Sequence, residues 1–366
     1  MDRRWGIFVL VAVMSGLVVG VPAQAREDAV FGSRYTSARA AGMADAFLPL
    51  ADDAASALFY NPAGIARFRK VSFDPWNITL QSTTDYLSQL DLGAIKVTNL
   101  KNYSKVLETK NNGKTPGVGA ALLPAFSLPN FAVGLLGQST VSAKYVDGKI
   151  EYRSRYQFIP AAGFGLRLAS GVVRLGYSVQ WVNQASGAPS VLNGSTPLGY
   201  NEGLLQGAGF SHTVGVAFTL PYQYLPSFNL VGRNLLGLHY SSSVLYKMAP
   251  NPVGIPADEP TTFDGSFSME AKLGMGASAN YVLEYRDITN QSNISILTRL
   301  AFGMEFLYRN QYFFRAGFGS GYPAVGIGFK QGSADLGITW FTEELGSRFR
   351  DHGESRILLQ YQVRAF

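Results

Sequence analysis

The sequence predicts an all-β fold, a transmembrane antiparallel β-barrel of about 14 strands with a small, partly helical N-terminal hatch in its lumen. Three observations lead to this prediction. Long segments alternate large apolar residues with polar residues or glycine. Only 15% of the residues are charged while 47% are hydrophobic, and a typical globular domain is about a quarter charged. Short and longer connections also alternate along the chain.

The N-terminus is typical of a secretory signal peptide. A basic start, Asp2-Arg3-Arg4, is followed by an apolar stretch over 6–21 and by Ala23-Gln24-Ala25, an A-x-A cleavage pattern. An uncleaved membrane anchor is the alternative, which the small residues and Pro22 disfavour. We therefore expect three parts, which are a signal peptide over 1–25, a hatch or plug over 26–70 and a barrel over 71–366.

Period-two alternation is clearest in the middle of the chain. In RYQFIPAAGFGLRL, residues 155–168, the even positions carry Tyr156, Phe158, Phe164 and Leu166, whereas the odd positions carry arginine, glutamine, alanine and glycine. The segment 172–182 repeats this pattern after the turn Ala169-Ser170-Gly171. Two such runs around a short turn predict a β-hairpin.

The same pattern returns near the C-terminus, in RLAFGMEFLY over 299–308 and QYFFRAGFG over 311–319. A soluble β-sandwich also alternates. However, these strands exceed the usual length of about 5–6 residues, and their large aromatic face has no equally large partner surface unless it meets lipid. These features favour the membrane barrel over the sandwich.

The turn signals divide the chain into an even number of strands, as a single-chain barrel requires. The uncharged stretch 115–143 is long enough for a membrane helix, but Pro124 and Pro129 divide it into two strands. The terminal Phe366 is typical of outer-membrane barrels, although it stands one step out of phase with Ile357, Leu359, Tyr361 and Val363, which a bulge would correct. We expect strands at 71–82, 116–127, 131–146, 151–168, 172–186, 205–221, 226–242, 264–277, 281–288, 293–308, 311–319, 323–331, 334–344 and 355–366.

Several function classes are disfavoured by composition. There is no cysteine and there are three scattered histidines, so we expect no metal site and no cofactor. No cluster of Lys and Arg stands out from the net charge of +6, so we expect no nucleic-acid partner. A lipase-like enzyme would need Ser, His and Asp together on one rim, and we therefore expect no enzyme.

The stretch ADDAASALFYNPAGIARF, residues 51–68, precedes the first strand and is rich in small apolar residues. Because a barrel of this size encloses a wide lumen, we interpret the stretch as part of a plug that glycine and alanine on the wall allow to approach closely. Asn61-Pro62-Ala63-Gly64 ends the helical part, either as a simple turn or as a gating element. Asp52 and Asp53 are expected to bond turn amides or lumen arginines rather than to act as an acid–base pair.

This region, from Ser37-Ala38-Arg39 to Gly64, resembles the N-terminal hatch of the FadL superfamily, and Asn61-Pro62-Ala63 matches its hatch motif. Segments 226–237 and 315–346 look more like the PorV-type and plasmid TraF-like relatives. The resemblance implies a monomeric fourteen-stranded barrel in the outer membrane of a Gram-negative bacterium. It implies passive uptake of hydrophobic small molecules such as long-chain fatty acids. The PorV-type alternative is a non-transporting accessory in protein secretion or surface attachment, with a secreted protein or secretion machinery as partner.

Two further groups are candidate contact residues. Lumen-facing arginines could bind a ligand carboxylate or, as we favour, pair with Glu305 or with acidic residues of the hatch. The loop over 243–263 carries apolar residues where a loop normally faces water, so it could receive a hydrophobic ligand or a cargo protein, or cap the barrel. The arginines are Arg155, Arg167, Arg174, Arg299 and Arg315, and the loop residues are Leu245, Tyr246, Met248, Val253 and Ile255.

Overall fold

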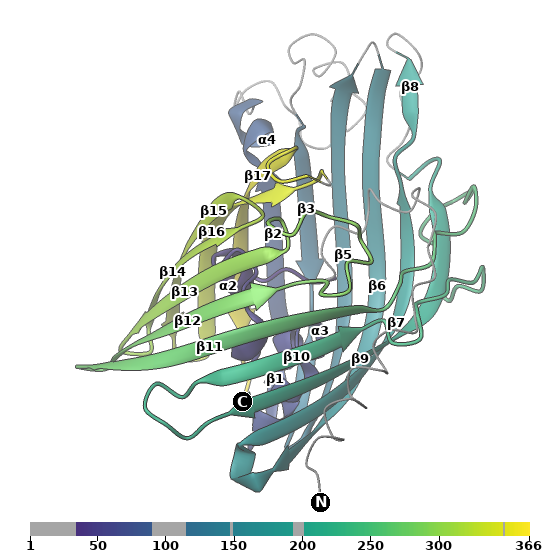
Figure 1. Ribbon diagram of the computed structural model, residues 1–366. Coiled ribbons are helices and arrows are strands. Elements are labelled where there is room, and N and C mark those ends of the chain that lie inside the picture. Colours follow the sequence, from purple (N-terminus) through teal and green to yellow (C-terminus); the bar gives the residue numbers. More distant parts are fainter. Residues whose placement is uncertain (1–33, 90–114, 147–148, 193–200, 347) are drawn as a thin grey trace, which may run out of the picture.

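The computed structural model describes residues 34–89, 115–146, 149–192, 201–346 and 348–366. These residues form a closed antiparallel barrel with fourteen strand positions and short helical segments inside it (Figure 1), which confirms the predicted fold class. The expected signal peptide lies outside the described residues. No helix in the described part of the chain is long and apolar enough to cross a membrane.

At two of the fourteen positions around the barrel, a proline divides the strand into two segments. Pro75 separates β1 from β2, and Leu123-Pro124 separates β3 from β4. A short strand, β8 (Ser190–Leu192), pairs with the end of β6. The strands are β1 (Ser72–Asp74), β2 (Trp76–Thr83), β3 (Gly117–Leu122), β4 (Ala125–Leu128), β5 (Phe131–Val146), β6 (Lys149–Leu168), β7 (Val173–Gly187), β9 (Leu205–Thr219), β10 (Ser227–Arg233), β11 (Thr262–Gly274), β12 (Ala277–Tyr285), β13 (Leu300–Tyr308), β14 (Tyr312–Gly319), β15 (Tyr322–Gln331), β16 (Ala334–Glu344) and β17 (Gly353–Val363).

Successive strand positions pair with each other, and the last strand returns to the first. β17 pairs with β2 from Arg356↔Thr83 to Val363↔Trp76. Among the described strands, this closure leaves no open sheet edge, whose backbone groups lipid could not hydrogen-bond.

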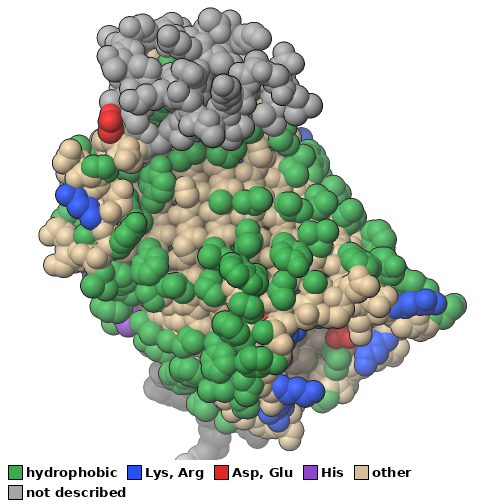
Figure 2. Space-filling model, turned by 180° about the vertical axis from the view of Figure 1, so that it is seen from behind, with side chains coloured by type: hydrophobic (Ala, Val, Ile, Leu, Met, Phe, Trp, Pro, Cys, Tyr) green, Lys and Arg blue, Asp and Glu red, His purple; other side chains and the backbone are tan. Residues whose placement is uncertain are grey.

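The outer face of the wall is apolar. Phe164, Phe210, Phe228, Phe314 and Phe318 all expose their rings, and the rings of Phe228 and Phe267 lie 5.0 Å apart on neighbouring strands. Figure 2 shows apolar side chains spread over one face of the wall, with few charges among them. The alternate positions face the lumen and are mostly polar or small, as the sequence predicts.

The wall is not equally tall all round. The strands β5, β6, β7 and β9 contain 16, 20, 15 and 15 residues. On the opposite side, β10 has 7 residues, while β12, β13 and β14 have 9, 9 and 8. Figure 1 shows the long strands rising well above their shorter neighbours.

Two predicted strands are wrong at the ends that lead into longer connections. The strand predicted over 226–242 ends at Arg233, because Asn234, Leu236 and Gly237 all have positive φ and turn the chain. The strand predicted from residue 293 begins at Leu300. The preceding residues form turns around Asp287, whose carboxylate accepts hydrogen bonds from the backbone N–H groups of Gln291 and Ser292 at 3.0 and 2.7 Å.

Near the C-terminus, the structure contains the expected shift between inward-facing and outward-facing positions. The first strand position contains a matching shift at Pro75. The Ala365 N–H donates to the Phe73 carbonyl (2.7 Å), and the rings of Phe73 and Phe366 lie 6.2 Å apart. Because Trp76 is also exposed on the outer face, the outward positions switch between odd and even numbers at Pro75. Phe366 thereby lies with the outer aromatic residues, while Arg364 pairs with the buried Asp74.

The hatch, defined here as residues 34–70, packs inside the barrel. It contains α2 (Ala38–Ala41), η1 (Leu48–Leu50), α3 (Ala54–Phe59) and η2 (Pro62–Arg67). Its largest apolar side chains are almost fully buried, and they form one core with residues of the wall. These side chains are Tyr35, Met43, Phe47, Leu58, Phe59 and Ile65.

Candidate functional site

The stretch 51–68 forms two short helices inside the lumen, and each is capped at its start. Asp53 begins α3 through a capping box, in which its carboxylate accepts from the Ser56 N–H at 2.8 Å and Ser56 Oγ accepts in return. Asn61 caps the start of η2 by accepting from the Ala63 N–H at 3.1 Å, and Pro62 follows at the first helical position. Asp52 makes no such cap and instead pairs with Arg39.

The Asn61 side chain also forms hydrogen bonds to two separate parts of the protein. Its amide donates to the Leu48 carbonyl at 3.0 Å within the hatch and to Asn229 Oδ1 at 3.2 Å on β10. The residue is 2% exposed. Asn61 therefore caps a helix and anchors the hatch to the wall with one side chain.

Glycines on three adjacent strands let this part of the hatch touch the wall backbone. A Cβ added at Gly176 on β7 would lie 2.0 Å from the Pro62 carbonyl carbon and oxygen. Added at Gly215 on β9, it would lie 2.3 Å from Asn61 Oδ1, and at Gly165 on β6 it would lie 2.4 Å from the Ala66 nitrogen. No larger side chain fits at these positions without moving the hatch.

A second contact of this kind holds the other side of the hatch. A Cβ at Gly317 on β14 would lie 2.3 Å from the Met43 carbonyl carbon, and one at Gly303 on β13 would lie 2.8 Å from Met43 Cβ. The hatch is thus held closely between two opposite regions of the barrel wall.

Charged groups of the wall complete the hydrogen bonding of the hatch backbone. Glu284 on β12 accepts from the N–H groups of Phe47 and Leu48 at 2.9 and 3.1 Å. Arg233 on β10 donates to the carbonyls of Phe59 and Tyr60 at 2.9 and 3.1 Å while it pairs with Asp264. These contacts satisfy backbone groups that the short helical segments leave open.

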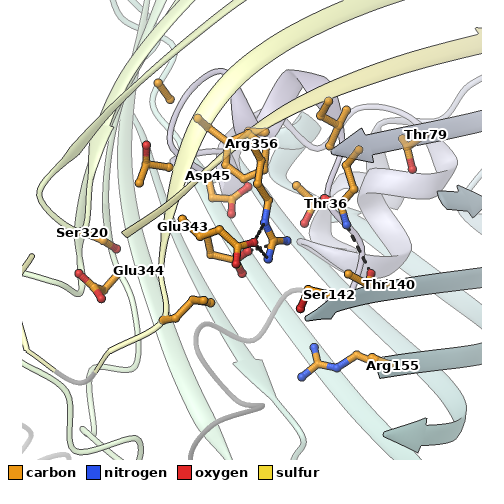
Figure 3. Close-up of a pocket in the computed structure, with 18 of the residues that line it drawn as sticks. Thr36, Asp45, Thr79, Thr140, Ser142, Arg155, Ser320, Glu343, Glu344 and Arg356 are labelled. Carbon is orange, nitrogen blue, oxygen red and sulfur yellow. Dashed lines mark hydrogen bonds and ion pairs between the residues drawn. The ribbon is translucent and has the colours of Figure 1, made fainter. Parts of the chain in front are cut away.

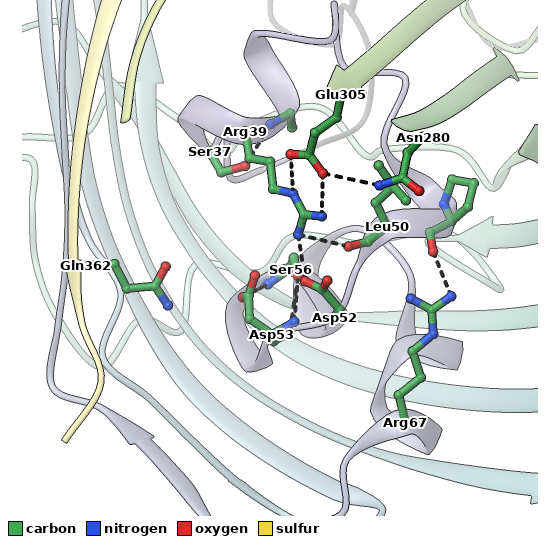
Figure 4. Close-up of polar contacts among 12 residues, drawn as sticks. Ser37, Arg39, Leu50, Asp52, Asp53, Ser56, Arg67, Asn280, Glu305 and Gln362 are labelled. Carbon is green, nitrogen blue, oxygen red and sulfur yellow. Dashed lines mark hydrogen bonds and ion pairs between the residues drawn. The ribbon is translucent and has the colours of Figure 1, made fainter. Parts of the chain in front are cut away.

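A buried ion-pair cluster joins the hatch to β13 and β14 (Figure 4). Glu305 is fully buried and lies between Arg39 of the hatch and Arg315 of β14, with N–O distances of 2.8 Å to each. Arg39 also contacts Asp52 at 2.7 Å. Arg315 therefore pairs within the wall instead of standing free to bind a ligand.

The other predicted lumen arginines are not brought together. Arg299 donates to the Asp287 carbonyl at 2.7 Å, and Arg174 donates to Thr219 Oγ1 at 2.7 Å. Arg167 is exposed near the short turn at the end of β6. Arg155 alone of the five lines a cavity on the side of the hatch toward the longer loops.

This upper cavity has a volume of about 220 Å³ and lies between the hatch and the ends of β2, β5, β6, β16 and β17 on that side. Its wall is polar (Figure 3), and Arg356 pairs there with Glu343 at 2.8 Å and with Glu354 at 2.6 Å. Asp45 of the hatch faces the same space.

A lower cavity of about 370 Å³ lies on the other side of the hatch. It is lined by hatch residues, including Tyr35, Arg39 and Asp52, and by wall residues such as Lys330 and Gln362. Both cavities are lined by many charged and polar groups, so neither is the apolar pocket that a hydrophobic ligand would prefer.

Part of the apolar core lies on the side of the long strands. Leu136 on β5, Ile159 on β6 and Val182 on β7 belong to the same buried core as Leu58 of α3. Leu238 and Tyr240, which follow β10, also belong to this core. Apolar side chains are therefore continuous from the loop after β10 to the hatch.

The loop containing these residues, 234–261, exposes several of the side chains singled out from the sequence. Leu245 is 86% exposed, and Tyr246, Val253 and Ile255 are also exposed, whereas Met248 is half-buried. The loop is anchored to β9, because Gln206 Oε1 accepts from the N–H groups of Met248 and Ala249. It thus presents an apolar surface on an ordered base.

Arg34 links this loop to the hatch and was not identified from the sequence. Its guanidinium lies 2.6 Å from Glu259 and also donates to Asn234 at 3.0 Å and to Gln180 at 3.2 Å. Burial disfavours ionisation of Glu259, but the Arg34 charge and hydrogen bonds from Tyr240 and Asn234 outweigh it and lower the pKa of Glu259. Isolated charged residues carry no pattern in a sequence, so only the fold reveals this pair.

Within the described residues, no group of three or more His, Cys, Asp or Glu side chains could hold a metal ion. A scan against protein-family models finds no match, and a search of curated proteins finds none either. Solved structures do show similarity. The toluene transporter TbuX of Ralstonia pickettii has a TM-score of 0.49 at 12% identity, over 88% of this chain and 97% of that one. The P. putida toluene transporter TodX has a TM-score of 0.40 at 10% identity, over 84% and 92%. An outer membrane channel from Pseudomonas putida F1 has a TM-score of 0.37 at 11% identity, over 82% and 97%.

Proposed function

We propose that this protein is an outer-membrane channel for the passive uptake of hydrophobic small molecules in a Gram-negative bacterium, and that it is not an enzyme. The observation that carries the proposal is the continuous apolar core from the loop 234–261 through Leu238 and Val182 to Leu58 of the hatch. A hydrophobic molecule that lands on the loop can exchange contacts with this core step by step, without crossing water. Transfer from water into the apolar interior supplies the driving force.

The wall beside this core offers a place for sideways release. The β6–β7 ladder runs from Ser154↔Gly187 to Leu168↔Val173 but lacks bridges at Ile159 and Pro160. Proline has no N–H to donate, so the two strands are held less strongly at this point. Ile159 lies in the apolar core directly inside the weakened part of the wall.

Two chemical classes of ligand are candidates for this channel. Long-chain fatty acids are one candidate, suggested by the resemblance of the hatch sequence, and a small aromatic hydrocarbon such as toluene is another, suggested by the two similar structures that are toluene transporters. A fatty acid carries a carboxylate and toluene does not. Arg155 in the upper cavity is the candidate partner of that carboxylate. We propose a monomer, in contact with outer-membrane lipid.

Uptake of each candidate into liposomes that contain the purified protein tests the proposal. Leu245→Ser and Val253→Ser change exposed side chains, so the fold should be retained. We expect slower uptake of the transported compound with both variants. Met275→Ser serves as the matched control, because Met275 is 95% exposed at the β11–β12 turn, at the other end of the barrel. Equal uptake by all variants and by protein-free liposomes would contradict the proposal.

A second candidate function is the non-transporting accessory in protein secretion or surface attachment. The exposed apolar surface of the loop 234–261, with Leu236 89% exposed and Leu245 86% exposed, favours it, because such a surface also suits a protein partner. The same loop variants would then abolish recovery of a stoichiometric partner and leave uptake unchanged.

A further inference from the structure

The two polar cavities approach each other along the inner face of β17. Inward-facing side chains alternate along this strand, and Leu358 lines the upper cavity while Gln360, the next inward residue, lines the lower cavity. Residues two apart on a strand are separated by about 7 Å. On the neighbouring β16, Phe341 lines the upper cavity and Gly337 the lower, with Thr339 between them. A single layer of residues therefore separates the cavities.

The partition between them is α2, which is one helical turn. Ala38 lines the lower cavity and Ala41 lines the upper cavity. The turn is attached to β16 and β17 by two hydrogen bonds, from Thr339 Oγ1 to the Ala38 carbonyl and from the Ala38 N–H to Gln360 Oε1, each 2.7 Å long. Ala38 and Ala41 also pack against Ala324, Phe341 and Leu358, and Arg39 of the same turn pairs with Glu305 of β13. Because the alanine side chains are small, each of these apolar contacts contributes little.

Each cavity extends toward a different end of the barrel. The upper cavity includes Ser320 and Leu345, beside the extracellular loops. The lower cavity includes Asn310 and Lys330, beside the short turns at the opposite end. Charged and amide side chains line both, which suits water and hydrated solutes rather than hydrocarbon.

We propose that this barrel has a second, hydrophilic route, in which displacement of α2 joins the two cavities along β16, β17 and β2 and admits small polar solutes or ions. The gate lies at β16 and β17, apart from the buried core residues Leu136, Ile159 and Val182, although β5 and β6 also line the upper cavity. This gate is the contact of α2 with Thr339 and Gln360.

A reversible disulfide tests this gate directly. The chain has no cysteine, so an introduced pair has no competitor. A Cβ at Gly337 would lie 3.0 Å from Ala38 Cβ, close enough for an Ala38→Cys, Gly337→Cys pair to bond after a small adjustment. The variant is reconstituted into liposomes, and permeation of arabinose and potassium chloride is measured under oxidising and then reducing conditions. We expect permeation to fall to the protein-free level when oxidised and to return on reduction, which also shows that the variant is folded.

An Ala125→Cys, Gly134→Cys pair is the matched control. These residues face each other across the β4–β5 ladder, and a Cβ at Gly134 would lie 3.6 Å from Ala125 Cβ. This disulfide joins two strands of the wall and leaves α2 free. We expect its oxidation to leave permeation unchanged, and an equal loss with both pairs would overturn the gate.

Weakening the attachment of α2 should have the opposite effect. Thr339→Val removes one of its two hydrogen bonds to β16 and β17, which should raise the population of the displaced state, and hence permeation, about fivefold. Thr213→Val, at a buried position on β9 that lines neither cavity, should change nothing. If Thr339→Val passes no more arabinose or salt than the protein-free liposomes, there is no hydrophilic route.

Discussion

Arg39 of the hatch and Glu305 of β13 are joined by two parallel hydrogen bonds, from Nε to Oε2 and from Nη2 to Oε1, each 2.8 Å long. Bidentate pairs of this kind fix orientation as well as distance. Arg315 binds the same carboxylate from β14. The hatch is thus attached to the wall through a buried, charged cluster.

Glu305→Gln should loosen the hatch and destabilise the barrel. The amide cannot neutralise Arg39 and Arg315, and an uncompensated buried charge costs about 3–5 kcal/mol. The free energy of unfolding in detergent, measured by urea titration, should fall accordingly. Glu202→Gln, at an exposed position, should leave it unchanged. Equal stability of the two variants would mean that the cluster does not hold the hatch.

Gly176→Ala should displace the Asn61–Ala66 part of the hatch. The added methyl group would lie 2.0 Å from the Pro62 carbonyl, and such overpacking costs about 1–3 kcal/mol. Hydrogen exchange of residues 61–66 should become faster. Gly137→Ala on β5 is the matched control, because a Cβ there meets nothing within 4 Å. Unchanged exchange in Gly176→Ala would show that the hatch does not touch the wall at this point.

Asn61→Asp should weaken the hatch although it keeps a helix-capping oxygen. The carboxylate cannot donate to the Leu48 carbonyl or to Asn229, so two buried acceptors lose their partner. We expect a loss of about 1–3 kcal/mol, measured by the same urea titration. Asn61→Ala loses the cap as well, so a fully stable Asn61→Asp protein beside an unstable Asn61→Ala protein would show that only the cap matters.

The exposed pair His239–Asp258 should make the loop 234–261 sensitive to pH. The hydrogen bond to Asp258 raises the pKa of His239. Slight burial disfavours ionised Asp258, but the hydrogen bonds from His239 and the Tyr240 N–H outweigh it and lower the pKa of Asp258. The histidine contribution is complete below its unfolded pKa of about 6.5 and is lost as the pH rises through the folded pKa. The aspartate contribution is complete above about 3.9 and is lost as the pH falls through its folded pKa.

The loop should therefore be most ordered between about pH 4 and pH 6.5. Hydrogen exchange of residues 238–241, corrected for its intrinsic pH dependence, should show greater protection at pH 5.5 than at pH 8.5. Asp258→Asn should remove this difference. A difference that persists in Asp258→Asn would assign the pH effect to another group.

Much of the barrel follows from local pattern. Strict alternation around short turns predicts strands such as β6 and β7 to within a few residues, because each inward or outward position is specified by lipid on one side and the lumen on the other. The pattern fails where a strand gives way to turns stabilised by side chains. Asn234 turns the chain out of β10 through its positive φ, and Asp287 organises the chain before β13.

The sequence predicts that the hatch approaches the wall closely, but it does not predict which residues make the contacts. Glycine and alanine at lumen positions predict a close approach of the plug, and Gly176 and Gly317 provide it. Which arginine meets which acid depends on strand order and on the path of the hatch. The sequence suggests Glu305 as a partner of the lumen arginines, whereas Arg39 on the hatch becomes visible only when α2 is placed beside β13.

The central claim is that this barrel takes up hydrophobic small molecules, and native mass spectrometry of the protein purified from outer membranes in mild detergent, followed by lipid extraction, tests it most directly. We expect a bound small hydrophobe that is displaced by competitors and weakened by Val182→Asn, which places an amide in the apolar core. An empty barrel that is recovered with a stoichiometric protein partner would contradict the claim and support the accessory function.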